Sequence, residues 1–154
     1  MIKKVVVLSG KANIGKSYTV LKVYKMIISQ YESVLSALSE HADIENLERT
    51  DIRVIVTING IKVAIESQGD PGGRLVKSLK LFVKEECNLI ICTTRTRGQT
   101  INTVNKLEQH GYEIIWFKQN TEPNIMKQES GNLKMAKTIF GEIKEIIGNI
   151  GLIP

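Results

Sequence analysis

Residues 10–17 constrain the fold of this chain of 154 residues more than any other segment. They read Gly-Lys-Ala-Asn-Ile-Gly-Lys-Ser, which fits the pattern Gly-x-x-x-x-Gly-Lys-Ser/Thr without a mismatch. The apolar run at 5–8 just before them predicts a buried strand, and the stretch just after them has the spacing of an amphipathic helix. Strand, glycine-rich loop and helix, in this order, are the setting in which this pattern binds phosphate. We name residues 10–17 the glycine loop.

Each residue type in the glycine loop has a chemical reason to be there. Its backbone N–H groups can surround a β-phosphate, because glycines allow a close approach and unusual backbone angles. The first turn of the following helix adds unpaired N–H groups and the positive end of its dipole. Lys16 supplies a point charge for the β- and γ-phosphates, and the Ser17 hydroxyl is a ligand for Mg²⁺. The predicted phosphate-binding residues are Gly10, Lys11, Ala12, Asn13, Ile14, Gly15, Lys16, Ser17 and Tyr18.

The expected cofactors are therefore ATP or GTP together with Mg²⁺. We expect the Lys16 side chain to face solvent, so that Lys16→Ala weakens triphosphate binding and leaves the fold intact. The alternative interpretation of the glycine loop is a plain glycine turn that caps a helix, with Lys16 solvated. That alternative leaves both glycines, the lysine and the serine at these spacings as a coincidence.

Composition limits the kinds of protein that fit. A hydrophobic content of 42% and a charged content of 24% are ordinary for a globular protein, and we expect a single domain over 1–154. No apolar run approaches the length of a membrane span, and the run at 5–8 is too short for a signal peptide. We therefore expect a cytoplasmic protein with no membrane partner. Cys87 and Cys92 are expected to be small buried residues in a reducing compartment.

The formal net charge of +5 agrees with an anionic ligand, and a nucleotide is sufficient to explain it. The lysines are scattered along the chain, and no pattern of aromatic and basic residues suited to base stacking is visible. Direct binding of nucleic acid is therefore the less favoured alternative. His41 and His110 carry no partner pattern and are expected at the surface, and Trp116 is expected in the core.

Periodicity and turn signals predict the order of the elements. Strands are expected at 3–8, 51–58, 61–66, 89–92 and 114–117, and helices at 16–30, after 73, after 98 and after a loop at 119–130. Asn59-Gly60 between two β-rich runs predicts a type I′ hairpin. The segment 33–50 gives only weak helical signals. Alternation of strands and helices predicts a three-layer α/β/α sandwich with a mostly parallel sheet and one antiparallel β-hairpin.

A phosphate site of this kind needs a carboxylate near the end of a strand, either to order the metal's water or to polarise the attacking water. Glu66 ends the second arm of the hairpin and is the first candidate. Asp70 is the second, although Asp70-Pro71 also suits a helix cap. Asp51 opens the hairpin and is expected to lie away from the site. Ligands of such sheets bind beyond the carboxyl ends of the strands, where the loops are 10–16, 67–73, 93–98 and 118–130.

Arginines follow the strand expected at 89–92. Arg95 and Arg97 lie in that loop, and Arg74 follows the loop after the hairpin. A guanidinium pairs with phosphate through two hydrogen bonds and can neutralise transition-state charge. The alternative for each arginine is a solvated loop residue. An acceptor molecule would need its own pocket, for which residues 33–50 are the only suggestion.

The whole chain resembles a single-domain P-loop NTPase. The glycine loop, the hairpin and Glu66-Ser67-Gln68-Gly69 resemble the small GTPases, in which a hairpin ends in Asp-x-x-Gly. This resemblance implies that Glu66 holds the metal's water and that Gly69 meets the γ-phosphate. Glutamate replaces aspartate here, and no Asn-Lys-x-Asp follows 89–92, so guanine specificity is not implied. The Gly-Asp-Pro-Gly and Thr-Arg-Thr-Arg-Gly segments resemble uncharacterised bacterial ATP-binding proteins.

Three functions follow from these expectations. The first is Mg-dependent binding of a nucleoside triphosphate, with ATP preferred, and its hydrolysis. The second is phosphoryl transfer to a small molecule or nucleotide, because nucleotide kinases resemble this chain in their use of several arginines. The third is a nucleotide-dependent binding module with little catalysis. The predicted catalytic residues are Lys16, Glu66, Arg95 and Arg97, and the predicted metal ligands are Ser17, Glu66 and Asp70.

Overall fold

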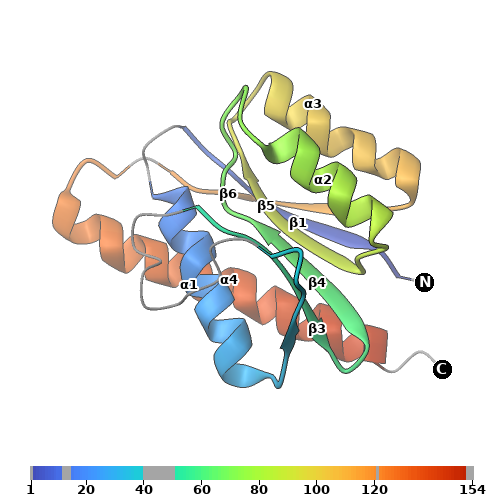
Figure 1. Cartoon of the computed structure of the whole chain (residues 1–154). Helices are drawn as coiled ribbons and strands as arrows, with labels where there is room; N and C mark the ends of the chain where they lie inside the picture. Colours follow the sequence, from blue (N-terminus) through green and yellow to red (C-terminus); the bar gives the residue numbers. More distant parts are fainter. Residues whose placement is uncertain (1, 12–14, 40–50, 121, 152–154) are drawn as a thin grey trace.

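The computed structural model of this chain describes residues 2–11, 15–39, 51–120 and 122–151 (Figure 1). Its strands are β1 (Lys4–Ser9), β2 (Val34–Leu35), β3 (Arg53–Ile58), β4 (Ile61–Glu66), β5 (Leu89–Thr94) and β6 (Glu113–Lys118). Its helices are α1 (Lys16–Gln30), α2 (Leu75–Lys84), α3 (Gln99–Asn105) and α4 (Ile125–Gly151). A 3₁₀ segment, Lys106–His110, continues α3.

The strands form one sheet in the order β2-β3-β4-β5-β1-β6. β1 lies between β5 and β6 and is parallel to both, and β4 is parallel to β5. β3 is antiparallel to β4, and the turn between them has positive φ at Asn59 and Gly60, as the predicted type I′ hairpin requires. The start of β3 therefore lies beside the end of β4. Residues just before β3 and residues just after β4 are thus close together.

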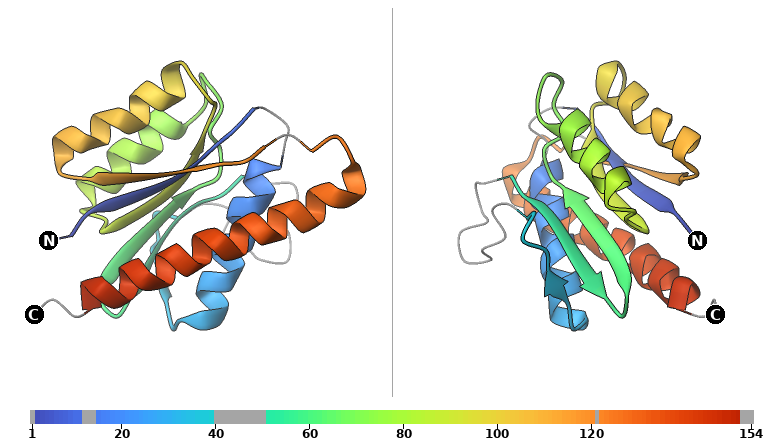
Figure 2. Two further views of the ribbon diagram at one scale, coloured as in Figure 1. Left: turned by 180° about the vertical axis from the view of Figure 1, so that it is seen from behind. Right: turned by 45° about the vertical axis from the view of Figure 1, so that its right-hand side comes forward.

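Helices cover both faces of the sheet, with α1 and α4 on one face and α2 and α3 on the other (Figures 1 and 2). Two buried clusters correspond to the two faces. The cluster beside α1 and α4 includes Val6, Ile65 and Ile91, and the cluster beside α2 and α3 includes Val7 and Ala64. The result is an α/β arrangement with a mostly parallel sheet, which agrees with the predicted three-layer sandwich.

Local signals explain most element boundaries. Gly111 ends the 3₁₀ segment with φ of 87°, a left-handed conformation that glycine adopts easily, so the predicted stop signal is confirmed. The predicted loop at 119–130 is wrong, because α4 already begins at Ile125. Asn124 explains the early start, since its side-chain oxygen accepts a hydrogen bond from the N–H of Met126 at 3.0 Å.

Three further expectations concern single residues. Trp116 is not in the core: it is 41% exposed, because β6 is an edge strand of the sheet. Cys87 and Cys92 are both buried, as predicted, and burial raises the pKa of the Cys87 thiol to about 12. His110 is exposed, as expected, whereas His41 lies outside the described residues.

Segment 33–50 is described only up to residue 39. There Val34 and Leu35 form a short edge strand, which the sequence analysis did not predict. The suggestion that residues 33–50 provide an acceptor pocket therefore falls mostly outside the described residues. Within the part of the chain that the structure describes, no helix combines the length and the apolar character that crossing a bilayer requires.

Candidate functional site

The described ends of the glycine loop have the predicted setting. β1 ends at Ser9, and the N–H of Gly10 donates to the carbonyl of Thr94 at 3.1 Å, which fixes the loop to β5. Gly15 has φ of 91° and directly precedes α1. A side chain is strained at that angle, so the second glycine of the motif has a conformational reason. Ala12, Asn13 and Ile14 lie outside the described residues.

Lys16 lies inside this loop and does not face solvent. Its side chain is buried, and its ammonium donates to the carbonyls of Gly10 at 2.5 Å and Lys11 at 2.8 Å. Burial lowers the pKa of Lys16, while the charge of Asp70 raises it and the charge of Arg95 lowers it further. The expectation of a solvent-facing Lys16 is therefore wrong, because the ammonium bonds back to the carbonyls of Gly10 and Lys11.

Ser17 meets a carboxylate that the sequence reasoning set aside. Its hydroxyl lies 3.1 Å from Oδ1 of Asp51 and 3.2 Å from the carbonyl of Ser67. The same Asp51 oxygen accepts a hydrogen bond from the Ser67 hydroxyl at 3.0 Å. The expectation that Asp51 lies away from the site is therefore wrong. Asp51 stands just before β3, whose start lies at the carboxyl end of β4.

Glu66 points to the other face of the sheet. Its side chain is 0% exposed, and it forms a bidentate ion pair with Arg74, at 2.7 Å to Nε and 3.0 Å to Nη2. The hydroxyl of Ser78 on α2 donates to it at 2.6 Å, and the N–H of Gln68 donates at 3.1 Å. The structure therefore does not bring Glu66 and Ser17 together. These four hydrogen bonds, from three residues, give Glu66 a structural role in fixing α2 to the sheet.

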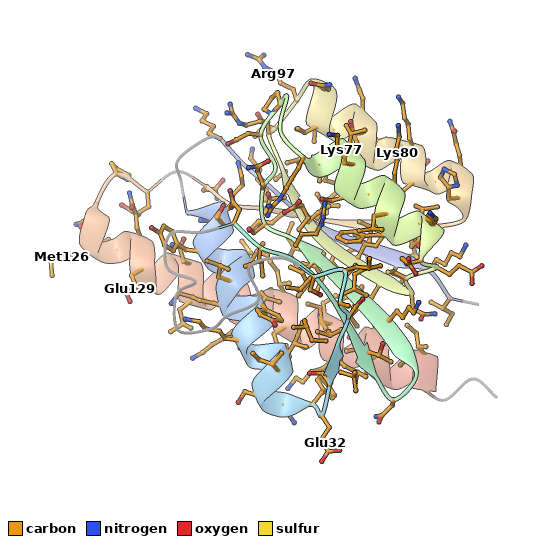
Figure 3. The ribbon with its side chains drawn as sticks, viewed as in Figure 1. Glu32, Lys77, Lys80, Arg97, Met126 and Glu129 are labelled. Carbon is orange, nitrogen blue, oxygen red and sulfur yellow. The ribbon has the colours of Figure 1, made fainter. Side chains whose placement is uncertain are left out.

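Gly69 and Asp70 lie in the loop after β4, close to Lys16 and Ser17. Gly69 packs so closely on β5 that a Cβ there would lie 2.2 Å from the carbonyl oxygen of Thr93. Asp70 forms an exposed ion pair with Nε of Arg95 at 3.0 Å. Arg97 lies in the loop after β5, two positions beyond Arg95. Its side chain is exposed and points away from the molecule (Figure 3). Of the two predicted catalytic arginines, Arg95 is the one that pairs with Asp70 and whose charge acts on the pKa of Lys16.

A cavity of about 330 Å³ opens where these residues meet. Its lining residues are Gly15, Lys16, Ser17, Tyr18, Asp51, Gln68, Gly69, Asp70, Thr93, Gln128 and Asn132. The lining combines the start of α1, the loop after β4, the end of β5 and one side of α4. A volume of this size is at the lower end of the range for small-molecule sites. It is large enough for phosphate groups and their counter-ion.

The sequence reasoning missed the contribution of α4. Asn132 on α4 is buried, and a Cβ at Gly15 would lie 2.6 Å from its Nδ2. Its Oδ1 accepts a hydrogen bond from Gln119 at 2.7 Å, and Gln119 in turn accepts one from the hydroxyl of Thr19 at 2.8 Å. Gln119 directly follows β6, so the rule that sites lie at carboxyl ends of strands could have identified it. No sequence signal identifies Asn132.

The donors at the cavity are suited to a hard cation that keeps part of its water. Ser17 and Asp51 offer a hydroxyl and a carboxylate oxygen on one side of the cavity. Within the described residues, no group of three or more His, Cys, Asp or Glu side chains could hold a metal by itself. A bound Mg²⁺ would thus need oxygens from a ligand and from water, as it often does in phosphate sites.

Comparison of the chain with protein-family models, with curated proteins and with solved structures found no match. The fold and the site define the chain as an α/β protein with a glycine loop, a buried lysine and a serine–aspartate pair at one edge of a mostly parallel sheet. What the site does must be inferred from these residues.

Proposed function

We propose that this chain binds a nucleoside triphosphate, with ATP as the expected one, together with Mg²⁺ in the cavity beside the glycine loop. The fold assignment that belongs to this proposal is the P-loop NTPase fold. One observation carries the proposal: the Ser17 hydroxyl and the Asp51 carboxylate lie 3.1 Å apart at the start of α1. A hydroxyl and a carboxylate suit Mg²⁺, while the helix N-terminus and the neighbouring ammonium suit phosphate.

The state of Lys16 supports anion binding at this point. Its ammonium is buried and donates hydrogen bonds to two loop carbonyls, which carry no formal charge. Burial of a charge is unfavourable, and the lowered pKa shows that the charge of Asp70 offsets this cost only in part. A phosphate within reach of Lys16 supplies a further counter-charge. Part of the binding energy therefore comes from better compensation of the buried ammonium.

Asp51 takes the role that the sequence reasoning gave to Glu66. Its carboxylate now accepts hydrogen bonds from the hydroxyls of Ser17 and Ser67. Ser17 would supply an oxygen ligand to a bound Mg²⁺, and Asp51 would hold one of the metal's waters. The chemistry that the ion would supply is neutralisation of charge on the β- and γ-phosphates. Glu66 has no part in this proposal, because Arg74 and Ser78 hold it on the other face.

The reaction we propose is transfer of the terminal phosphoryl group to water or to a hydroxyl acceptor. Arg95 is the candidate to neutralise charge on the transferred group. Asp70 and Arg95 are paired at 3.0 Å, and Asp70 lines the same cavity as Lys16. Phosphate release without an added acceptor supports hydrolysis, and release that requires an acceptor supports a kinase. Arg97→Ala is the matched control for Arg95→Ala, since Arg97 points away (Figure 3).

A thermal-shift panel of nucleoside tri-, di- and monophosphates, with and without Mg²⁺, tests the binding proposal. A ligand at 100 times its Kd stabilises the folded state by about 2.7 kcal/mol, which raises the Tm by roughly 5–10 °C for a chain of this size. We expect the largest shift with a triphosphate and Mg²⁺, and loss of that shift in Ser17→Ala. Ser29→Ala, at the exposed end of α1, is the control and should keep the shift. Equal shifts in the two variants contradict the proposal.

We also propose a cytoplasmic location for the chain. Cys87 and Cys92 are free and buried, which agrees with a reducing compartment. A cytoplasmic location also gives the site access to nucleoside triphosphates. Fractionation of cells that produce a tagged full-length chain checks this point.

A further inference from the structure

A groove of about 950 Å³ runs between α2 and α3, on the face of the sheet opposite to α1 and α4 (Figure 1). Its floor is apolar and is made by Val76, Leu79 and Val83 of α2 and by Leu107. Leu79 and Leu107 are buried, whereas Val76 and Val83 are only partly covered. The spacing 76, 79, 83 forms one stripe along a helix, which is the arrangement with which a helix packs on another helix.

The rim of this groove carries basic side chains, namely lysines and a histidine. Lys80 and Lys84 lie one turn apart on α2, and Lys106 and His110 lie one turn apart on the opposite side. Lys77 extends the α2 row by a further turn, and Figure 3 shows Lys77 and Lys80 on this side of the molecule. No acidic side chain is among the described residues that line the groove. The nearby Glu85 forms its ion pair with Lys62, at 3.7 Å.

A partner that binds this groove must complement an apolar floor that lies between two rows of basic side chains. A partner needs apolar side chains in a line to fill the floor and carboxylates on both flanks to meet the rows. An amphipathic helix with acidic flanks presents both groups at the spacing of α2 and α3. A nucleic acid would meet the amines but leave the apolar floor without a complement, and a small anion would leave most of the groove unfilled.

We propose that the α2–α3 groove is a docking site for an acidic amphipathic helix of a partner protein. The apolar anchors of that helix, at positions i, i+3 or i+4 and i+7, lie on Val76, Leu79, Val83 and Leu107. Its carboxylates pair with Lys80, Lys84 and Lys106. The groove shares no lining residue with the cavity beside the glycine loop, so docking needs no nucleotide.

A selection with displayed peptides tests the proposal on the full-length chain without nucleotide. The library presents random peptides of about 20 residues, long enough for a helix of roughly 30 Å. We expect enriched peptides to carry acidic residues and apolar residues at helical spacing. Their affinity, measured by fluorescence anisotropy, should fall by about tenfold or more in Lys80→Glu/Lys84→Glu, since charge reversal replaces attraction by repulsion. Val83→Ser should weaken the same peptides through loss of the apolar contact.

The matched control is Lys134→Glu/Lys137→Glu, which makes the same charge change at two exposed positions of α4, outside the groove. Enriched peptides should bind this control as they bind the wild type. Four results overturn the proposal: no enrichment, enrichment of basic or non-helical peptides, equal loss in both double variants, and self-association that Lys80→Glu/Lys84→Glu abolishes. The last result would assign the groove to a second copy of this chain. Circular dichroism confirms that each variant is folded before its affinity is compared.

Discussion

The Ser17 hydroxyl lies 3.1 Å from a carboxylate oxygen of Asp51, although 34 positions separate the two residues in the chain. The antiparallel direction of β3 brings them together, because it carries the start of β3 to the edge where β4 and β5 end. Ser67 fixes the carboxylate from the other side, with a hydrogen bond of 3.0 Å. The pair is therefore formed before any ligand arrives.

The first prediction concerns this pair. Ser17→Ala and Asp51→Asn should each weaken binding of a triphosphate with Mg²⁺ by about tenfold or more, because a charge-assisted interaction is worth roughly 1.5–3 kcal/mol. The double variant should lose less than the sum of the single losses, since both residues act through one ion. In excess EDTA the three variants and the wild type should bind alike. Glu32→Gln, at the far end of α1, is the control for the charge change (Figure 3). Additive losses that persist in EDTA would contradict a shared ion.

The second prediction concerns Glu66. Glu66→Gln should lower the free energy of unfolding by roughly 3–5 kcal/mol, because it removes the fully buried partner of the ion pair with Arg74. Urea denaturation measures this change. Asp70→Asn breaks an exposed ion pair and should cost about 1 kcal/mol or less. An unchanged urea midpoint in Glu66→Gln, with phosphate release abolished, would instead support a catalytic role for Glu66.

The third prediction concerns the packing of Gly69 on β5. Gly69→Ala should strongly destabilise the chain or displace the loop after β4, since its Cβ would lie 2.2 Å from a backbone oxygen of Thr93. Gly141→Ala is the control, because a Cβ at that position of α4 meets no atom within 4 Å. There alanine should stabilise by roughly 0.5–1 kcal/mol through helix propensity. Thermal unfolding of both variants measures the contrast. Equal Tm values for Gly69→Ala and Gly141→Ala would contradict the close packing of Gly69 on β5.

The fourth prediction concerns proton uptake by Lys16. Burial lowers the pKa of Lys16 in the free protein, and a bound phosphate should raise it, because an anion favours the charged form. Between these two pKa values the protein takes up a proton on binding, and affinity falls as the pH rises. Calorimetric titrations at alkaline pH, in buffers of different ionisation enthalpy, measure that uptake. Lys16→Met should abolish it. Proton release on binding would contradict the sign of the shift.

The position of Glu66 shows how a strand pattern could have corrected the sequence reasoning. Side chains alternate between the two faces of β4, so Val63 and Ile65 lie beside α1 and α4 while Ala64 and Glu66 lie toward α2. The glycine loop leads into α1, so the face that matters is that of Ile65. The charge of Glu66 drew attention to it, but its position in the alternation assigns it to the opposite side.

Asp51 was predictable from the hairpin that the sequence already indicated. An antiparallel strand starts where its partner ends, so a residue just before β3 must lie near the residues just after β4. The order of elements, the turn at Asn59-Gly60 and the glycine loop with its following helix follow from local patterns. Asn132 does not, because its contact with Gly15 depends on how the long helix α4 crosses the sheet edge, and no local pattern encodes that crossing.

The most direct test of the central claim is a calorimetric titration of ATP and of GTP into the full-length chain, in Mg²⁺ and in excess EDTA. The account predicts saturable binding of a triphosphate at one site, weakened by about tenfold or more when Mg²⁺ is removed and again by Ser17→Ala. The absence of binding by either nucleotide, or equal binding with and without Mg²⁺ in both proteins, would contradict it.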